Sequence, residues 1–200
     1  MESVLIQFVF DKRIDKAKQL LLEGVNPNLV TGPLNSSLLM VAVYNQDDEM
    51  VKLLLEAGAD PNSQDANGMT ALMDAAYKGY RGIVKQLLQK KADIHLKNNE
   101  NMTALMESAR GGDLEIVREL LERGADIDFQ DKYGWTALHY AVSKGHNNVV
   151  RLLLTFGADT RLGADCHNAP IDVARSLLEE DLVIKGELEK IITLLEKNIS

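Results

Sequence analysis

The sequence is poor in cysteine and in positive charge. Its one cysteine, Cys166, excludes an internal disulfide and a cysteine-based zinc cluster. Against 30 acidic residues stand 22 lysines and arginines, which gives a net charge of −8. Such a surface repels phosphate backbones and no cluster of basic residues relieves the repulsion, so we expect no nucleic-acid binding. No apolar stretch approaches the length of a membrane span, and we expect no membrane association.

Motifs that would indicate catalysis are also missing. The chain has no P-loop, no dinucleotide fingerprint and no G-x-S-x-G motif. Metal-ligand spacing is missing around all four histidines: His95, His139, His146 and His167. The EF-hand pattern is not met by the closely spaced acids Asp126, Asp128 and Asp131. We therefore expect no catalytic residues, no cofactor and no metal, and an enzyme with a composite site is a remote alternative.

The chain does contain a short sequence motif that recurs every 33 residues. Thr-Ala-Leu occurs at residues 70–72, 103–105 and 136–138. Ala-Asp keeps the same interval at residues 59–60, 92–93, 125–126 and 158–159. Self-similarity at such a period predicts a solenoid, in which each unit buries its apolar face only against its neighbours.

The residues at this period resemble the ankyrin repeat. The closest copy runs from Gly134 to Ala141, in the order Gly-Trp-Thr-Ala-Leu-His-Tyr-Ala, and is followed by Gly145-His146, Leu152-Leu153-Leu154 and Gly157-Ala158-Asp159. The resemblance covers essentially all 200 residues. It implies an all-α ankyrin-repeat solenoid of stacked helix-turn-helix units with β-hairpin-like finger loops.

The period divides the chain into six units of one domain, residues 1–200. The boundaries are an N-terminal cap 1–31, the repeats 32–64, 65–97, 98–130 and 131–163, and a C-terminal cap 164–200 with an insertion near 179–187. The apolar start lacks the basic region of a signal peptide. Displaced by 33 residues, it falls on the opening of the next first helix, so we interpret it as a terminal repeat. Caps at both ends favour a complete chain.

Each unit is expected to hold two helices. In the unit that begins at Asp65, Thr70 caps the first helix and Gly79 ends it. The second helix should bury one apolar face, formed by Ile83, Val84, Leu87 and Leu88. The first helices can approach closely because they share a small residue at one position: Ala42, Ala75, Ser108, Ala141 and Ala174. His139 is expected to bond Thr136, a structural role.

The resemblance implies that a partner protein docks on the fingertips and the concave first helices. The family pattern makes ten residues of this surface candidates for partner contact: Tyr44, Met69, Asp74, Tyr77, Met102, Glu107, Arg110, Tyr133, Trp135 and Tyr140. We expect Trp135 to be the anchor, since aromatic residues and Met are enriched in interface cores. Packing of Met69, Met102 and Trp135 against adjacent fingers is the alternative interpretation. Carboxylates at Asp74 and Glu107 favour a basic or mixed apolar–basic epitope.

The leading functional hypothesis is a non-catalytic scaffold, either an adaptor or an inhibitor of one partner protein. The alternative is a secreted bacterial-type effector or targeting module that acts on a host protein. A single cysteine fits a cytoplasmic location, and export without a cleavable signal peptide is the alternative location. We expect a monomer in the absence of the partner.

Overall fold

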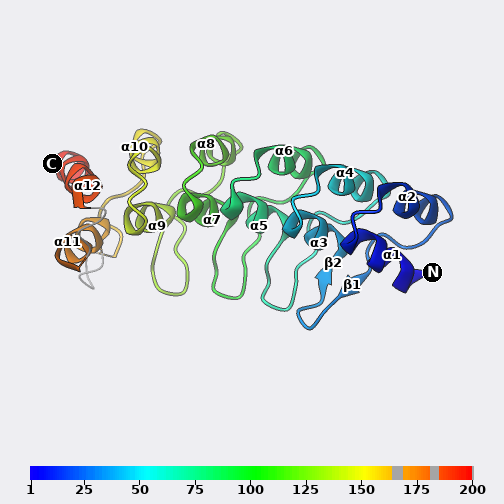
Figure 1. Cartoon of the computed structure of the whole chain (residues 1–200). Helices are drawn as coiled ribbons and strands as arrows, with labels where there is room; N and C mark the ends of the chain where they lie inside the picture. Colours follow the sequence, from blue (N-terminus) through cyan, green and yellow to red (C-terminus); the bar gives the residue numbers. More distant parts are fainter. Residues whose placement is uncertain (164–168, 181–184, 200) are drawn as a thin grey trace.

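The computed structural model describes residues 1–163, 169–180 and 185–199. Helix pairs stack side by side into an elongated array, with the chain termini at opposite ends (Figure 1). The first helices form one row: α1 (Glu2–Phe10), α3 (Leu38–Tyr44), α5 (Ala71–Lys78), α7 (Ala104–Gly111), α9 (Ala137–Ser143) and α11 (Pro170–Glu180). The second helices form another: α2 (Ile14–Leu22), α4 (Asp48–Glu56), α6 (Arg81–Gln89), α8 (Leu114–Glu122), α10 (Asn147–Thr155) and α12 (Lys185–Ile199). The predicted all-α solenoid is confirmed.

The first helices begin and end at the residues that the repeat predicts. The Thr70 hydroxyl accepts a hydrogen bond from the Met73 N–H at 3.2 Å, and so pairs a donor that has no partner within the helix. Ser37 and Thr103 cap α3 and α7 in the same way. Gly79 ends α5 with a φ of +74°, a left-handed conformation that glycine adopts without steric cost.

The core is continuous along the stack and lies between the two helix rows. The predicted apolar face of α6 is buried: Ile83, Val84, Leu87 and Leu88. The small residues predicted to let the first helices approach are all fully buried: Ala42, Ala75, Ser108, Ala141 and Ala174. Each helix pair therefore buries its apolar surface against its neighbours, as a solenoid requires.

The fingers are joined to one another at their tips. The Ala66 N–H donates to the Leu34 carbonyl oxygen of the preceding finger at 2.8 Å. The next two contacts repeat this bond, from Asn99 to Asn67 and from Lys132 to Glu100, at 2.9 and 3.0 Å. Within the described residues only the first finger contains strands, β1 (Val30–Thr31) and β2 (Ser36–Ser37), which pair antiparallel. The hydrogen bonds between neighbouring fingers join the fingertips into one surface.

The two ends depart from the central pattern. Leu5 of α1 is fully buried like Leu38 of α3, 33 residues later, so the apolar start packs as a terminal first helix. In the last unit α11 has 11 residues and α12 has 15, longer than the central helices. Part of the predicted insertion near 179–187 is thus helical, and residues 181–184 lie outside the described part. None of the described helices is long and apolar enough to cross a membrane.

Candidate functional site

The row of first helices and the fingers together form one surface, which we call the finger face. Three predicted contact residues are exposed on it: Tyr44, Tyr77 and Tyr133, with 71%, 42% and 68% of their surface accessible. Five are half-buried: Met69, Asp74, Arg110, Trp135 and Tyr140. The finger face thus presents exposed tyrosines from the repeats 32–64, 65–97 and 131–163.

Two predicted contact residues are buried, and their placement at the surface was wrong. Met102 is only 6% exposed and belongs to the continuous apolar core. Glu107 is 3% exposed. It lies mid-helix on α7, between α5 and α9, and the close approach of these first helices covers it. Neither side chain can form the surface of a contact without a rearrangement of its neighbours.

Both predicted carboxylates are already paired with a cation of their own helix. Lys78 Nζ lies 3.4 Å from Asp74 Oδ2 and 4.0 Å from the centre of the Tyr44 ring. Arg110 Nη1 lies 3.5 Å from Glu107 Oε2, and its guanidinium carbon lies 4.4 Å from the centre of the Tyr77 ring. Each cation therefore joins a carboxylate to an aromatic ring of the preceding unit. The basic or mixed apolar–basic epitope predicted opposite Asp74 and Glu107 would therefore meet carboxylates that are already paired, and that of Glu107 is buried.

Burial shifts the pKa values of both carboxylates. Desolvation raises the pKa of Glu107 above its usual value, Arg110 opposes the rise, and the charge of Asp74 adds to it. Desolvation likewise raises the pKa of Asp74, against the opposing effect of Lys78. For both groups burial outweighs the ion pair, so the charged form is held at a cost to folding.

This cost predicts a pH-dependent effect of Glu107→Gln. Because the pKa of Glu107 is raised in the folded state, its ionisation destabilises the fold above that pKa, and the effect vanishes below the ordinary value of 4.5. The variant should raise the thermal midpoint by about 1–3 °C at pH 7.5. The gain should shrink as the pH falls toward 4. Thermal melts across this range test the prediction, with the exposed Glu122→Gln as control; a constant or negative difference would refute it.

Trp135 packs on its own unit. Its ring stacks on His139 with centroids 5.8 Å apart and meets Tyr140 edge-on at 5.2 Å. Asp131 connects the backbone and the ring of this cluster: its Oδ1 accepts from the Trp135 backbone N–H at 2.9 Å, and its Oδ2 accepts from the Tyr140 hydroxyl at 2.5 Å. Burial, then the bond to Asp131, raises the pKa of Tyr140. The indole therefore packs against two rings of its own unit and leaves part of its surface exposed.

The three histidines that the structure describes, His95, His139 and His146, lie apart from one another and have different surroundings. Nδ1 of the buried His139 lies 3.0 Å from the Thr136 N–H and 2.9 Å from its hydroxyl, as predicted. His146 Nε2 bonds the Arg110 carbonyl oxygen at 3.1 Å, and His95 is exposed on a finger. Cys166 and His167 lie outside the described residues. The described residues contain no group of three or more potential metal ligands.

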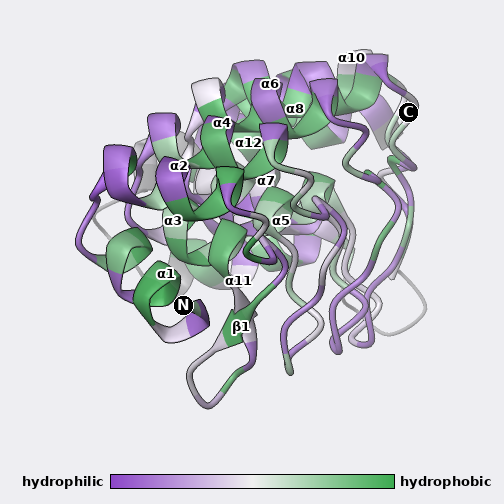
Figure 2. Ribbon diagram, turned by 90° about the vertical axis from the view of Figure 1, so that its right-hand side faces the viewer, coloured by the Kyte–Doolittle hydropathy of each residue, from purple (hydrophilic) through white to green (hydrophobic). Residues whose placement is uncertain are grey.

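A groove of about 420 Å³, not foreseen from the sequence, opens on the finger face at its N-terminal end. Its apolar lining comes from α1, the first two fingers and α3: Phe10, Leu34, Met40, Val41, Tyr44 and Met69. Figure 2 shows the hydrophobic residues of α1 and β1 at this end of the molecule. The sequence signal for the groove was a set of apolar residues near the start of the chain: Phe10 in the N-terminal cap, and Leu34, Met40 and Val41 in the next repeat.

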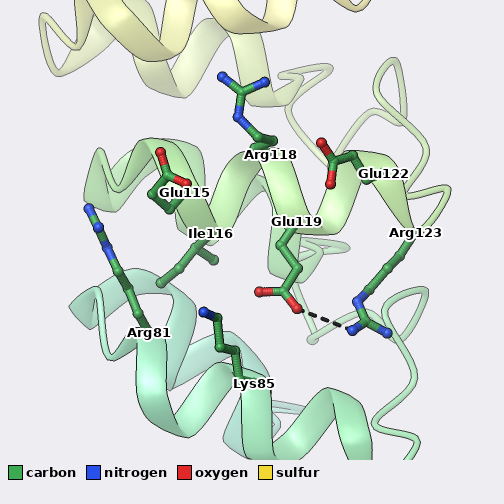
Figure 3. A pocket seen from close by; sticks show the side chains of 8 residues that line it. All are labelled: Arg81, Lys85, Glu115, Ile116, Arg118, Glu119, Glu122 and Arg123. Carbon is green, nitrogen blue, oxygen red and sulfur yellow. Dashed lines mark hydrogen bonds and ion pairs between the residues drawn. The ribbon is translucent and has the colours of Figure 1, made fainter.

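A second hollow, of about 650 Å³, lies on the opposite side, between α6 and α8 (Figure 3). Arg81 and Lys85 of α6 face Glu115 and Glu119 of α8 across it. Acids and bases alternate here, and Glu119 is paired with Arg123 at 3.1 Å. Ile116, the one apolar lining residue, is fully covered. This hollow has the character of a solvated helix surface.

The comparisons with known proteins agree with this architecture. A family model described as ankyrin repeats in three copies matches residues 5–98 and 82–164. The crystal structure of an ankyrin repeat domain from Acinetobacter baumannii AYE superposes with a TM-score of 0.85, at 28% sequence identity, over 99% of this chain and 98% of that one. No match was found among curated proteins. The period, the capped helix pairs and the family match lead to one conclusion: this chain belongs to the ankyrin-repeat family.

Proposed function

We propose that this protein is a non-catalytic protein-binding module that contacts one partner, as an adaptor or an inhibitor, through its finger face. The observation that carries the proposal is the presence of exposed tyrosines on that face in three of the central repeats, Tyr44, Tyr77 and Tyr133. Tyrosine supplies a large apolar contact area and a hydroxyl for hydrogen bonding, and it is enriched among residues that dominate binding energy. Ankyrin repeats in general mediate protein–protein interactions, which supports the same proposal.

The distribution of charge favours the finger face over the row of second helices on the opposite side, which we call the outer helices. On the finger face the cations Lys78 and Arg110 lie over tyrosine rings and are paired with carboxylates. A partner that covers these two pairs covers charges that already have a partner, so the cost of removing water from them is small. The outer hollow presents seven charged side chains, so a large apolar contact there would leave many charges poorly solvated.

Trp135 remains the proposed anchor at the C-terminal part of this surface. His139 and Tyr140 fix its ring, so little conformational freedom is lost when a partner covers the open part of the indole. The Asp131 carboxylate, which accepts hydrogen bonds from the backbone N–H groups of Tyr133 and Trp135, stabilises this fingertip conformation without a partner. A preorganised aromatic side chain of this kind fits the usual properties of a binding hot spot.

Substitution of the exposed tyrosines tests the proposal. The double variant Tyr44→Ser with Tyr77→Ser should lower the recovery of the bound partner at least about tenfold in a quantitative affinity capture, because it removes two contact residues. The matched control is Arg118→Ala with Glu122→Ala on the outer helix α8, which should retain the partner. Both variants should keep the wild-type circular dichroism spectrum. Loss of the partner from the control but not from the tyrosine variant would refute the proposal.

A further inference from the structure

The groove at the N-terminal end of the finger face is the site from which a more specific partner can be inferred. Phe10 and Leu34, on its rim, are 50% and 44% exposed, and Tyr44 is more exposed still. Met40 and Val41 are buried beneath them. A volume of about 420 Å³ is large enough for one or two bulky side chains and too large to be a packing defect.

A comparison of equivalent positions in successive units shows what is special about its polar wall. In the unit of Trp135, the fingertip Asp131 receives the Tyr140 hydroxyl, nine residues later, on Oδ2. In the groove, the equivalent pair is Asp65 and Asp74, both of which line the cavity. The hydroxyl donor of the one unit is thus replaced by a second carboxylate in the other.

The hydrogen bonds of Asp65 leave one side of its carboxylate available. Its Oδ1 accepts from the Asn67 and Met69 N–H groups at 2.8 and 2.9 Å, as Asp131 does in its own finger. Within the described residues no hydrogen bond reaches Asp65 Oδ2. The charge of Asp65 also raises the pKa of Asp74, after desolvation, so the two carboxylates influence one another across the groove wall.

Lys78 is the cation beside these two carboxylates, so one positive charge faces two negative charges. It pairs with Asp74 at 3.4 Å and lies over the ring of Tyr44. A second cation placed between Asp65 and Asp74 would supply the donor that Tyr140 supplies in the later unit and would reduce the mutual repulsion. The apolar rim beside it would shield this contact from water, which strengthens it.

We propose, on the basis of the protein-binding function above, that this groove binds a partner segment with a large apolar side chain beside a lysine or arginine. The apolar side chain lies over Met40 and Val41 between Phe10, Leu34 and Met69. The basic group lies between Asp65 and Asp74. The groove lies apart from Trp135, which is at the C-terminal part of the finger face. A partner that contacts both the groove and Trp135 would therefore span most of that face.

Selection from a displayed library of random dodecapeptides on the immobilised full chain tests this inference. The enriched peptides should share an apolar residue next to a lysine or arginine, and a synthetic copy should bind in a fluorescence anisotropy titration. Asp65→Asn should weaken its binding at least about tenfold. This variant keeps the fingertip, because Asn98 makes the same two backbone bonds in the next finger. Leu34→Lys, at the exposed rim, should abolish binding, and Arg118→Ala on α8, on the opposite side of the molecule, should leave it unchanged.

The other results overturn the inference in distinguishable ways. Peptides that are lost with Tyr133→Ser but bind both groove variants would place the contact elsewhere on the finger face and leave the proposed function standing. Peptides whose binding is lost only when residues of the outer helices are substituted would refute both the groove site and the proposed function. Enriched peptides without a basic residue, no enrichment at all, or a wild-type dimer that Leu34→Lys makes monomeric in light scattering would each show that the groove has a different occupant or none.

Discussion

Leu120→Ala is expected to lower the free energy of unfolding by about 2–5 kcal/mol. Leu120 is fully buried on α8, in the middle of the second-helix row, where neighbouring units cover it on both sides. Its truncation removes apolar contacts from the central interface and leaves a cavity that the rigid helix pairs close only in part. In a solenoid, the loss of one interface weakens the coupling between the halves of the stack.

The control for Leu120→Ala is the same substitution at Leu22. Leu22 is at the end of α2 and is 80% exposed, so its truncation should change the free energy of unfolding by no more than about 0.5 kcal/mol. Urea unfolding followed by circular dichroism measures both variants. Equal losses would contradict the assignment of buried and exposed faces of the second helices.

Gly111→Ala has the second large expected effect. A Cβ at this position would lie 2.1 Å from the Tyr77 carbonyl oxygen, a backbone atom that cannot move unless α5 and α7 separate. We expect a loss of about 1–3 kcal/mol or more, the usual cost of overpacking. Because the shift would also displace Arg110 from the Tyr77 ring, partner binding should weaken together with stability.

Gly82→Ala on α6 is the matched control for this substitution. Its added Cβ would meet only Asp48 Oδ1, at 2.8 Å, the end of an exposed and flexible side chain. That carboxylate can move aside, and alanine favours the helix over glycine by roughly 1 kcal/mol. Thermal melts should therefore show little change or a small gain for Gly82→Ala. If Gly111→Ala were tolerated equally well, the close approach of α5 and α7 would not be required for the fold.

The helices, their caps and the buried faces could be predicted from the sequence because they follow from local rules. Thr70 caps a helix through its own neighbours, and Gly79 ends it through its own φ. Ile83 and Val84 are followed at helical spacing by Leu87 and Leu88, which predicts the burial of this face without knowledge of any other unit. These features repeat at each period, so errors in one unit are corrected by comparison with the next.

The candidate site was predicted less well because exposure on a stack depends on the neighbouring units. The family pattern gave Glu107 and Met102 a surface position, whereas adjacent first helices cover the former and the core accommodates the latter. The pairing of Arg110 with a ring on the preceding helix cannot be read from its own repeat. The groove was missed for the same reason: Phe10 of the N-terminal cap, Leu34 of the next repeat and Met69 of the third unit line one cavity only in the folded chain.

Site-specific photo-crosslinking tests the central claim, that partners bind the finger face. A benzophenone amino acid at position 77, in place of the exposed Tyr77, would probe that face, and the same group at position 118 would probe outer helix α8. We predict that irradiation in cell extract joins a defined partner to the protein labelled at position 77, with little product at position 118. A partner joined at position 118 and not at position 77 would contradict the account.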